Sequence, residues 1–564
     1  MIETQIKTSV TYHTLSTSIA QRVAGRVALL PKCRRIILKM AVIEIEQGKV
    51  KGVLCGSNDG IYVSFKGIPY AKPPLGPLRF KAPQPPEPWQ GIRDASEHGP
   101  VCPQFNERLQ SIEAGSEDCL YLNIYSKSVR PSTPLPVMVW IHGGAYYTGS
   151  GNSDFYGPDF FMKHDVILVT INYRLEVLGF LCLDNEEVPG NAGLKDQVAA
   201  LQWVKNNIGA FGGDTNNITI FGCSAGAASV SFHLLSKMST GLFNKAICQS
   251  GVCLNDWAYS IYGRQRAFQL GRLLGKDTED TAELLEFLRN VPVSSLVNIK
   301  LPLVETNHRD ITDGIFFAPV IEKSELNVEK FITESPIDLV KRGCFAKVPL
   351  IVGYTSGEGI ELGRSFPATL DFLTTLGAVV PRELKLKFDI AKLQDADDKI
   401  RKYYFKGKQL NADMIKEVVN LETDKLFAYN ITRLARYYNF SSTPVYLYKM
   451  TVETDRNFTK KIYNMQFIPG VCHADDLPYL FNITCFDIPM TEESKHVVEN
   501  FVQLWYNFAS TGNPTSTNIA VEWKQFTDKE RECFVIDKTL NCISNIDAEN
   551  MNFWENIFEE TVLP

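Results

Sequence analysis

The stretch that decides the fold reads Ile218-Thr219-Ile220-Phe221-Gly222-Cys223-Ser224-Ala225-Gly226-Ala227-Ala228-Ser229-Val230. Its apolar and β-branched residues predict a buried strand, Gly-x-Ser-x-Gly predicts a sharp turn, and the small residues predict the start of a helix. We expect Ser224 to adopt a strained backbone conformation, because Gly222 and Gly226 remove the side chains that would collide in such a turn. The alternative interpretation is an ordinary strand-to-helix turn, since so short a motif also arises by chance.

Other segments extend this pattern along the chain. Apolar runs at 121–125, 137–141 and 166–171 predict strands, and helical spacing predicts a helix over 194–206. Alternating residues at 42–46 and 50–54 predict a small N-terminal antiparallel sheet. We therefore expect an α/β fold with a large, mostly parallel central sheet and helices on both faces. In such sheets the chemistry gathers at the carboxyl ends of strands, so partners of Ser224 should lie in loops that follow strands.

Composition excludes several classes of function. The chain has 564 residues, with 58 Lys and Arg against 64 Asp and Glu, a net charge of −6 that gives no electrostatic basis for binding nucleic acid. Its 13 Cys show no paired Cys-x-x-Cys spacing, which argues against a structural zinc site. No apolar run is long enough to span a bilayer. We expect a globular protein without a metal or another cofactor.

Residues 1–39 differ from the rest of the chain. They hold seven basic residues and one acid, are rich in Ser and Thr, and contain no apolar run long enough for a signal peptide. The favoured interpretation is a disordered extension or an unused upstream start before Met40, with residues 40–564 as a single domain. The alternative is a mitochondrial presequence, which has the same composition. We accordingly expect a cytoplasmic location.

A serine nucleophile needs a histidine base and a carboxylate that orients it. Of the eight His, four precede Ser224, whereas this fold has the chain order Ser, acid, His. His233 and His496 fall within predicted helices, and His308 follows no strand. His473 remains, in a loop downstream of the strand expected at 445–450, and its alternative role is merely structural.

The acid should follow an apolar strand between these two positions. Glu358 is the first carboxylate after the run at 348–354, and glycines on both sides let it reach inward. Asp313 and Asp475 are alternative candidates for the acid. The alternative interpretation of Glu358 itself is a solvated acid in a loop. The oxyanion hole is expected at His142-Gly143-Gly144-Ala145, which follows a strand, with the backbone N–H of Ala225 as a further donor. His142 itself is expected to pack this turn.

With these residues the chain resembles the type-B carboxylesterase and cholinesterase family, especially insect carboxylesterases, over residues 40–564. The motifs that carry the resemblance include the following: Phe65-Lys66-Gly67-Ile68-Pro69-Tyr70-Ala71, Glu117-Asp118-Cys119-Leu120-Tyr121-Leu122-Asn123, Gly190-Asn191-Ala192-Gly193-Leu194, Phe211-Gly212-Gly213-Asp214 and Asn507-Phe508-Ala509. The resemblance implies an α/β-hydrolase fold, Ser224 as nucleophile, His473 as base and Glu358 as acid. It also implies oxyanion-hole amides at Gly144, Ala145 and Ala225.

The sequence departs from this family at two places in the site. Cys223 stands where the elbow usually has Glu or Gln, and Ala145 stands where a third Gly is common, so we expect a narrower pocket mouth. The resemblance further implies a disulfide between Cys102 and Cys119, which would stay reduced in the cytosol.

The predicted function is hydrolysis of neutral carboxylic esters, from xenobiotics, lipids or odorants, through an acyl-enzyme. Two other classes stay open: a member that sequesters ligands or insecticides with slow turnover, and a non-catalytic binding member. A cholinesterase is disfavoured because the interval 103–118 has no Trp, and a juvenile-hormone esterase because Cys223 is not Gln. We expect a small-molecule ester as the partner and a monomer or homodimer.

Overall fold

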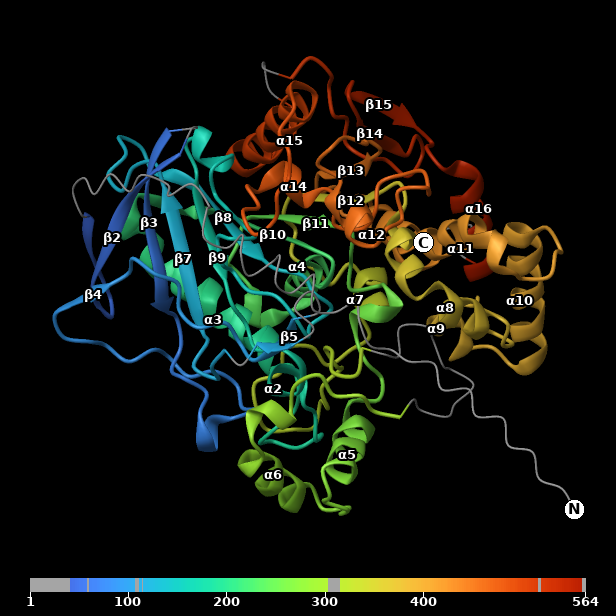
Figure 1. The fold of residues 1–564 in the computed structure, drawn as a ribbon, viewed down its shortest axis with the longest axis horizontal. Coiled ribbons are helices and arrows are strands. Elements are labelled where there is room, and N and C mark those ends of the chain that lie inside the picture. The colour runs from blue at the N-terminus through green and yellow to red at the C-terminus, as the bar shows by residue number, and fades with distance from the viewer. Residues whose placement is uncertain are drawn as a thin grey trace, which may run out of the picture.

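The structure is a computed structural model that describes residues 41–57, 60–106, 111–113, 115–302, 315–515 and 519–559. A sheet of 13 strands crosses the molecule, from the N-terminal strands at one edge to the C-terminal strands at the other (Figure 1). In spatial order its strands are β1 (Ala41–Ile45), β2 (Gly48–Ser57), β3 (Gly60–Pro69), β7 (Tyr121–Ser126), β9 (Ile167–Ile171), β8 (Leu135–Ile141), β10 (Gly213–Cys223), β11 (Lys245–Gln249), β12 (Leu350–Thr355), β13 (Val445–Met450), β14 (Glu532–Ile536) and β15 (Asn541–Ser544), with β4 (Ile92–Asp94) beside β2.

Neighbouring strands from β9 to β14 pair in parallel, which confirms the predicted α/β fold with a mostly parallel sheet. The N-terminal strands β1, β2, β3 and β7 pair antiparallel and are continuous with this sheet, because β7 also pairs with β9. A small separate antiparallel sheet consists of β5 (Gln104–Asn106) and β6 (Ser111–Glu113).

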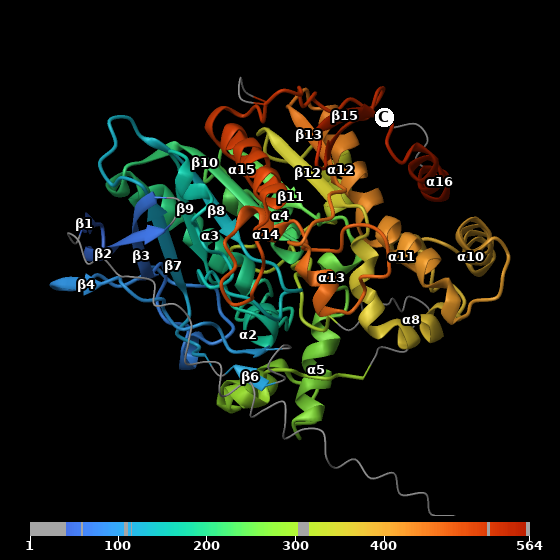
Figure 2. The same ribbon diagram turned by 45° about the horizontal axis from the view of Figure 1, so that its top comes forward.

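The two faces of the sheet pack into two different cores. Along β8, Val137 and Val139 belong to one buried cluster, whereas Met138 and Trp140 belong to another, as the alternation of side chains on a strand requires. Helices α3 (Ala192–Asn207), α4 (Ala225–Leu235) and α12 (Tyr429–Asn439) contribute to the first cluster, and α15 (Glu492–Thr511) contributes to the second. Helices therefore cover both faces, as Figure 2 shows.

The remaining helices lie around this three-layered centre, with α5 and α6 at one end of the molecule and α8 to α11 at one side (Figure 1). Their bounds are α2 (Glu176–Phe180), α5 (Gly263–Leu273), α6 (Thr281–Asn290), α7 (Pro336–Lys341), α8 (Phe366–Leu373), α9 (Arg382–Lys385), α10 (Ile390–Phe405), α11 (Ile415–Thr423), α13 (Phe458–Ile462), α14 (Leu477–Leu480) and α16 (Ala548–Phe558).

Strand β10, which leads into the decisive turn, begins earlier than its apolar run at Ile218. Gly213 already pairs with Leu135 of β8, and the register then shifts before Ile218. The polar residues between them are half-buried or exposed, so hydrophobic patterning could not mark this part of the strand.

The remaining predictions from the sequence concern a membrane span and residues that the structure does not describe. None of the described helices is long and apolar enough to cross a membrane. The expectations for residues 1–39, His308 and Asp313 fall outside the described residues, so they stay predictions.

Candidate active site

The turn at Ser224 has the strained geometry that its glycines predict. Ser224 has φ 59° and ψ −126°, a conformation that costs a residue with a side chain about 1–3 kcal/mol. A Cβ atom on Gly226 would lie 2.1 Å from the carbonyl oxygen of Ile141, and one on Gly222 would lie 2.6 Å from it. Because neither distance is possible without backbone movement, only glycine fits both positions, and Ser224 stands half-buried between β10 and α4.

Glu358 and His473 lie side by side although they are 115 residues apart. Glu358 follows β12 and is completely buried; its Oε1 accepts a 2.7 Å hydrogen bond from the backbone N–H of Thr355. Its Oε2 lies 2.6 Å from Nδ1 of His473, which is 5% exposed. The structure therefore pairs His473 with Glu358, and Asp475 instead accepts the backbone N–H of Thr459 at 2.7 Å.

Backbone contacts hold these two segments together. Gly357 and Cys472 form an isolated parallel bridge, and the N–H of Gly357 donates to the carbonyl oxygen of Val471 at 2.9 Å. The hydroxyl of Ser356 accepts the N–H of Val471 at 3.0 Å. Glu358 and His473 each directly follow a bridged residue, which explains why their side chains meet.

The electrostatic surroundings favour a charged His473. Burial by itself would lower its pKa, but the negative charges of Glu361 and Glu358 and the hydrogen bond to Glu358 outweigh burial and raise the pKa to about 9. The ring of Phe427 covers the imidazole, with the ring centroids 4.8 Å apart. Phe427 belongs to a π-helical segment, η10 (Asp424–Ala428), a local irregularity that is frequent at functional sites.

Strand β11 connects the turn to the loop of His473. The carbonyl oxygen of Gln249, its last residue, accepts the N–H of Ser224 at 2.9 Å. The side-chain amide of Gln249 donates to the buried carboxylate of Asp476 at 2.7 Å. Among the described residues there is no hydrogen bond between Ser224 Oγ and His473; such contacts are often long without substrate and shorten when it binds.

The loop after β8 passes directly against the turn. A Cβ atom on Gly143 would lie 2.5 Å from the carbonyl oxygen of Cys223 and 3.1 Å from Cβ of Ser224. Gly144 and Ala145 both have positive φ, 102° and 49°. Within the described part of the chain, the backbone N–H groups of Gly144, Ala145 and Ala225 donate to no protein acceptor, as donors reserved for a ligand oxygen would.

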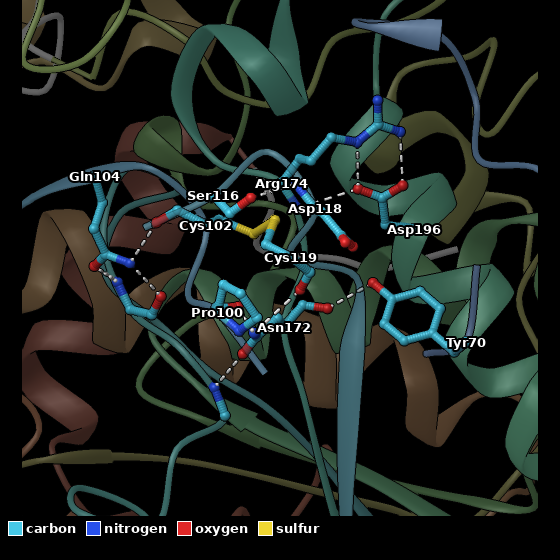
Figure 3. The surroundings of a disulfide bond; sticks show 12 residues. Tyr70, Pro100, Cys102, Gln104, Ser116, Asp118, Cys119, Asn172, Arg174 and Asp196 are labelled. Carbon is cyan, nitrogen blue, oxygen red and sulfur yellow. Dashed lines mark hydrogen bonds and ion pairs between the residues drawn. A yellow bond between two sulfur atoms is a disulfide. The ribbon is translucent and has the colours of Figure 1, made fainter. Parts of the chain in front are cut away.

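A disulfide supports the far end of this loop. Cys102 and Cys119 are bonded, as the sequence resemblance implies, and Figure 3 shows Gln104 beside them. The Gln104 amide donates to the carbonyl oxygens of Cys102 and Gly149 at 3.0 and 2.9 Å, and its oxygen accepts the N–H of Gly149 at 2.7 Å. The disulfide thus anchors a side chain that clamps the end of the glycine-rich loop.

Other histidines have structural contacts. His142 stacks on Tyr173, with ring centroids 4.4 Å apart, as its predicted packing role requires. His233 is buried and contacts Ser239 Oγ at 2.7 Å and Gln197 Oε1 at 2.9 Å.

Sequence reasoning left the role of Cys223 open and missed Glu361, Phe427, Gln249 and Asp476. The Cys223 side chain is buried on the α15 face of the sheet, and burial, followed by the charge of Asp476, raises the pKa of its thiol far above the usual range. Cys223 is therefore a neutral core residue. Of the four missed residues, only Glu361 had a signal in the local sequence, because it follows Glu358 by three residues.

No group of three or more His, Cys, Asp or Glu side chains that could hold a metal ion occurs among the described residues. The site consequently consists of a serine, a histidine paired with a carboxylate, and unengaged backbone donors.

Comparisons with known proteins agree with this chemistry. The sequence pattern of the Carboxylesterase family matches residues 39–554. A juvenile hormone esterase of Tribolium castaneum is 36% identical over 478 residues, 81% of this chain and 81% of the relative. A carboxylic ester hydrolase of Bombus ignitus is 34% identical over 539 residues, 91% of this chain and 94% of the relative.

Among solved structures, the crystal structure of juvenile hormone esterase from Manduca sexta, with OTFP covalently attached, superimposes with a TM-score of 0.82. Its sequence identity to this chain is 29%, and the match covers 92% of this chain and 100% of the other.

Proposed function

The chain belongs to the carboxylesterase family, and from this premise we propose that Ser224, His473 and Glu358 are the nucleophile, base and acid with which it cleaves carboxylic esters. The observation that carries this assignment is the buried 2.6 Å contact between Glu358 Oε2 and His473 Nδ1. A carboxylate on Nδ1 leaves Nε2 free to accept a proton from Ser224.

The reaction follows from these positions. Ser224 Oγ attacks the carbonyl carbon of the ester, and its proton passes to Nε2 of His473. The N–H groups of Gly144, Ala145 and Ala225 stabilise the oxyanion of the tetrahedral intermediate. The C–O bond to the alcohol breaks as His473 returns the proton to the alcohol oxygen. Water, deprotonated by His473, then attacks the acyl-enzyme, releases the acid and regenerates Ser224.

We infer that the substrates are neutral esters from xenobiotics, lipids or odorants, because no choline-binding Trp lies between Cys102 and Cys119. A second candidate is a juvenile-hormone ester, and the observation that favours it is the name shared by the relatives from Tribolium castaneum and Manduca sexta. A panel that contains juvenile hormone and esters of graded acyl and alcohol size separates the two, since the better substrate has the higher kcat/KM.

The test of the catalytic assignment is Ser224→Ala. We expect kcat for a nitrophenyl ester to fall by about 10⁵- to 10⁶-fold, because the residual rate comes from the oxyanion hole and binding alone. Ser64→Ala is the matched control, since Ser64 is a buried serine of β3 whose hydroxyl has no hydrogen-bond partner among the described residues. Activity of Ser224→Ala near that of the unaltered chain would overturn the proposal.

Covalent labelling by an organophosphate addresses the two other classes. Labelling of Ser224 with sustained turnover supports an esterase. A burst of product without sustained turnover indicates a sequestering member, and no labelling indicates a non-catalytic binding member.

We infer that residues 40–564 form a single domain, because one buried cluster includes residues from Ile43 to Phe558. The cytoplasmic location predicted from residues 1–39 is opposed by the closed disulfide, which is typical of an oxidising compartment. The oligomeric state, a monomer or homodimer, stays a prediction, because the structure contains a single chain. Cell fractionation and sedimentation of the native protein test these two predictions.

A further inference from the structure

Glu361 shares a helix face with Glu358. Both lie in η8 (Glu358–Ser365), a 3₁₀ helix, in which side chains three residues apart lie directly above one another. Glu361 is thus one turn beyond the carboxylate that contacts His473.

The other two faces of η8 have different neighbours. Gly359 faces α11, because its N–H donates to Thr423 Oγ1 at 2.9 Å and an added Cβ would lie 2.5 Å from the carbonyl oxygen of Val419. Ile360 packs in a small buried cluster that includes Met465 and Cys472. Only the remaining face can carry Glu361, and that face holds Glu358.

Within the part of the chain that the structure describes, the carboxylate of Glu361 has no competing partner. It is half-buried, and among the described residues it forms no hydrogen bond or ion pair. Its negative charge acts on His473, Cys223 and Cys472, which surround the site from β10 and from the base loop.

Glu358 and Asp476 also raise the pKa of the His473 imidazole, and the other titratable groups around it are engaged elsewhere or neutral. Glu358 binds the imidazole, Asp476 accepts from Gln249, and Asp475 accepts from Thr459. The Cys223 thiol is buried and neutral, and Lys460 of α13 pairs with Glu453. From η10, the uncharged ring of Phe427 packs against the imidazole.

We propose that Glu361 is a positioning residue. Its negative charge acts on His473 and sets the pH range in which this imidazole accepts the proton of Ser224. Its carboxylate stabilises the imidazolium that forms with the tetrahedral intermediate, and it also keeps the imidazole protonated to a higher pH in the free enzyme. This inference rests on the proposed function, because that function makes His473 the base.

The first experiment compares the pH dependence of kcat/KM for a neutral nitrophenyl ester between the unaltered chain and Glu361→Gln. The acid limb of this profile reports the base of the free enzyme. We expect it to move to lower pH by about half to one unit, so that on this limb kcat/KM relative to its own plateau rises about three- to tenfold. The plateau itself should fall less than tenfold.

Two variants control for structure and for net charge. Glu361→Asp keeps the carboxylate and should retain the profile of the unaltered chain. Glu334→Gln removes an exposed carboxylate that pairs with Arg342, and it should leave the acid limb unchanged. An unmoved limb in Glu361→Gln, an equal shift in Glu334→Gln, or a Glu361→Gln chain that does not fold would each overturn the inference.

Titration of the His473 imidazole by NMR, assigned through His473→Asn, gives a readout that does not depend on turnover. A lower imidazole pKa in Glu361→Gln supports the inference, and an equal value overturns it. If Ser224→Ala retains full activity while the imidazole still responds to Glu361, the proposed function fails and the electrostatic role of Glu361 stands.

Discussion

The turn at Ser224 and the pair of Glu358 and His473 meet at one site but are built in different ways. The turn is constrained by close packing: Gly222 and Gly226 lie against each other and against the end of β8 at Ile141. The pair depends on two segments 115 residues apart, joined by the bridge between Gly357 and Cys472. Steric space therefore limits which residues the turn at Ser224 can contain. Charge and hydrogen-bond direction limit which residues can form the pair of Glu358 and His473.

Of the variants that compare these two regions, Glu358→Gln should have the largest effect, because it reverses the direction of the hydrogen bond to His473. Its amide oxygen can still accept the N–H of Thr355, and its NH₂ group then faces Nδ1 of His473. Nδ1 has to accept this bond, so the proton moves to Nε2 and the imidazole cannot act as base. We expect kcat to fall about 10⁴-fold, or about 5.5 kcal/mol of activation free energy.

Steady-state kinetics measure this loss, and urea denaturation should show little change in the free energy of unfolding. A loss of less than tenfold would contradict the role of Glu358.

Gly226→Ala tests the spatial limit of the turn. The added methyl group would lie 2.1 Å from the carbonyl oxygen of Ile141, so the start of α4 and the end of β8 must separate. We expect the free energy of unfolding to fall by about 3–5 kcal/mol, measured by urea denaturation.

Gly56→Ala is the matched control in β2, since a Cβ there meets no described residue within 4 Å, and it should change stability by less than about 1 kcal/mol. Equal stability of the two variants would show that the turn accepts a side chain.

A smaller effect is expected from the disulfide, which supports the turn through the glycine-rich loop. Replacing Cys102 and Cys119 by Ser opens a loop with a sequence separation of 17, which should lower the free energy of unfolding by about 3 kcal/mol. Because Gln104 then clamps Gly149 less firmly, kcat should fall severalfold while KM changes less.

Thermal unfolding with and without a reductant measures the stability change. An unchanged melting temperature on reduction would contradict this role of the disulfide.

Much of the candidate site could be predicted because its residues stand at strand ends. The apolar runs before Ser224 and Glu358 are buried strands, and their local sequence reveals them. Hydrophobic patterning could not indicate Gln249 or Asp476, since each gains its role only because β11 lies between β10 and β12. Phe427 was equally hidden, because a π-helical segment has no periodicity that local sequence would reveal.

The sequence by itself determined the turn at Ser224, since a Cβ on Gly222 would already lie 2.6 Å from the carbonyl carbon of Gly226, four residues along the chain. Only the tertiary structure decided which carboxylate orients His473 and how strongly Glu361 acts on it. The physical reason is range: the contact between positions 222 and 226 lies within one short segment, whereas the electrostatic effects on His473 depend on distances and burial that exist only in the folded chain.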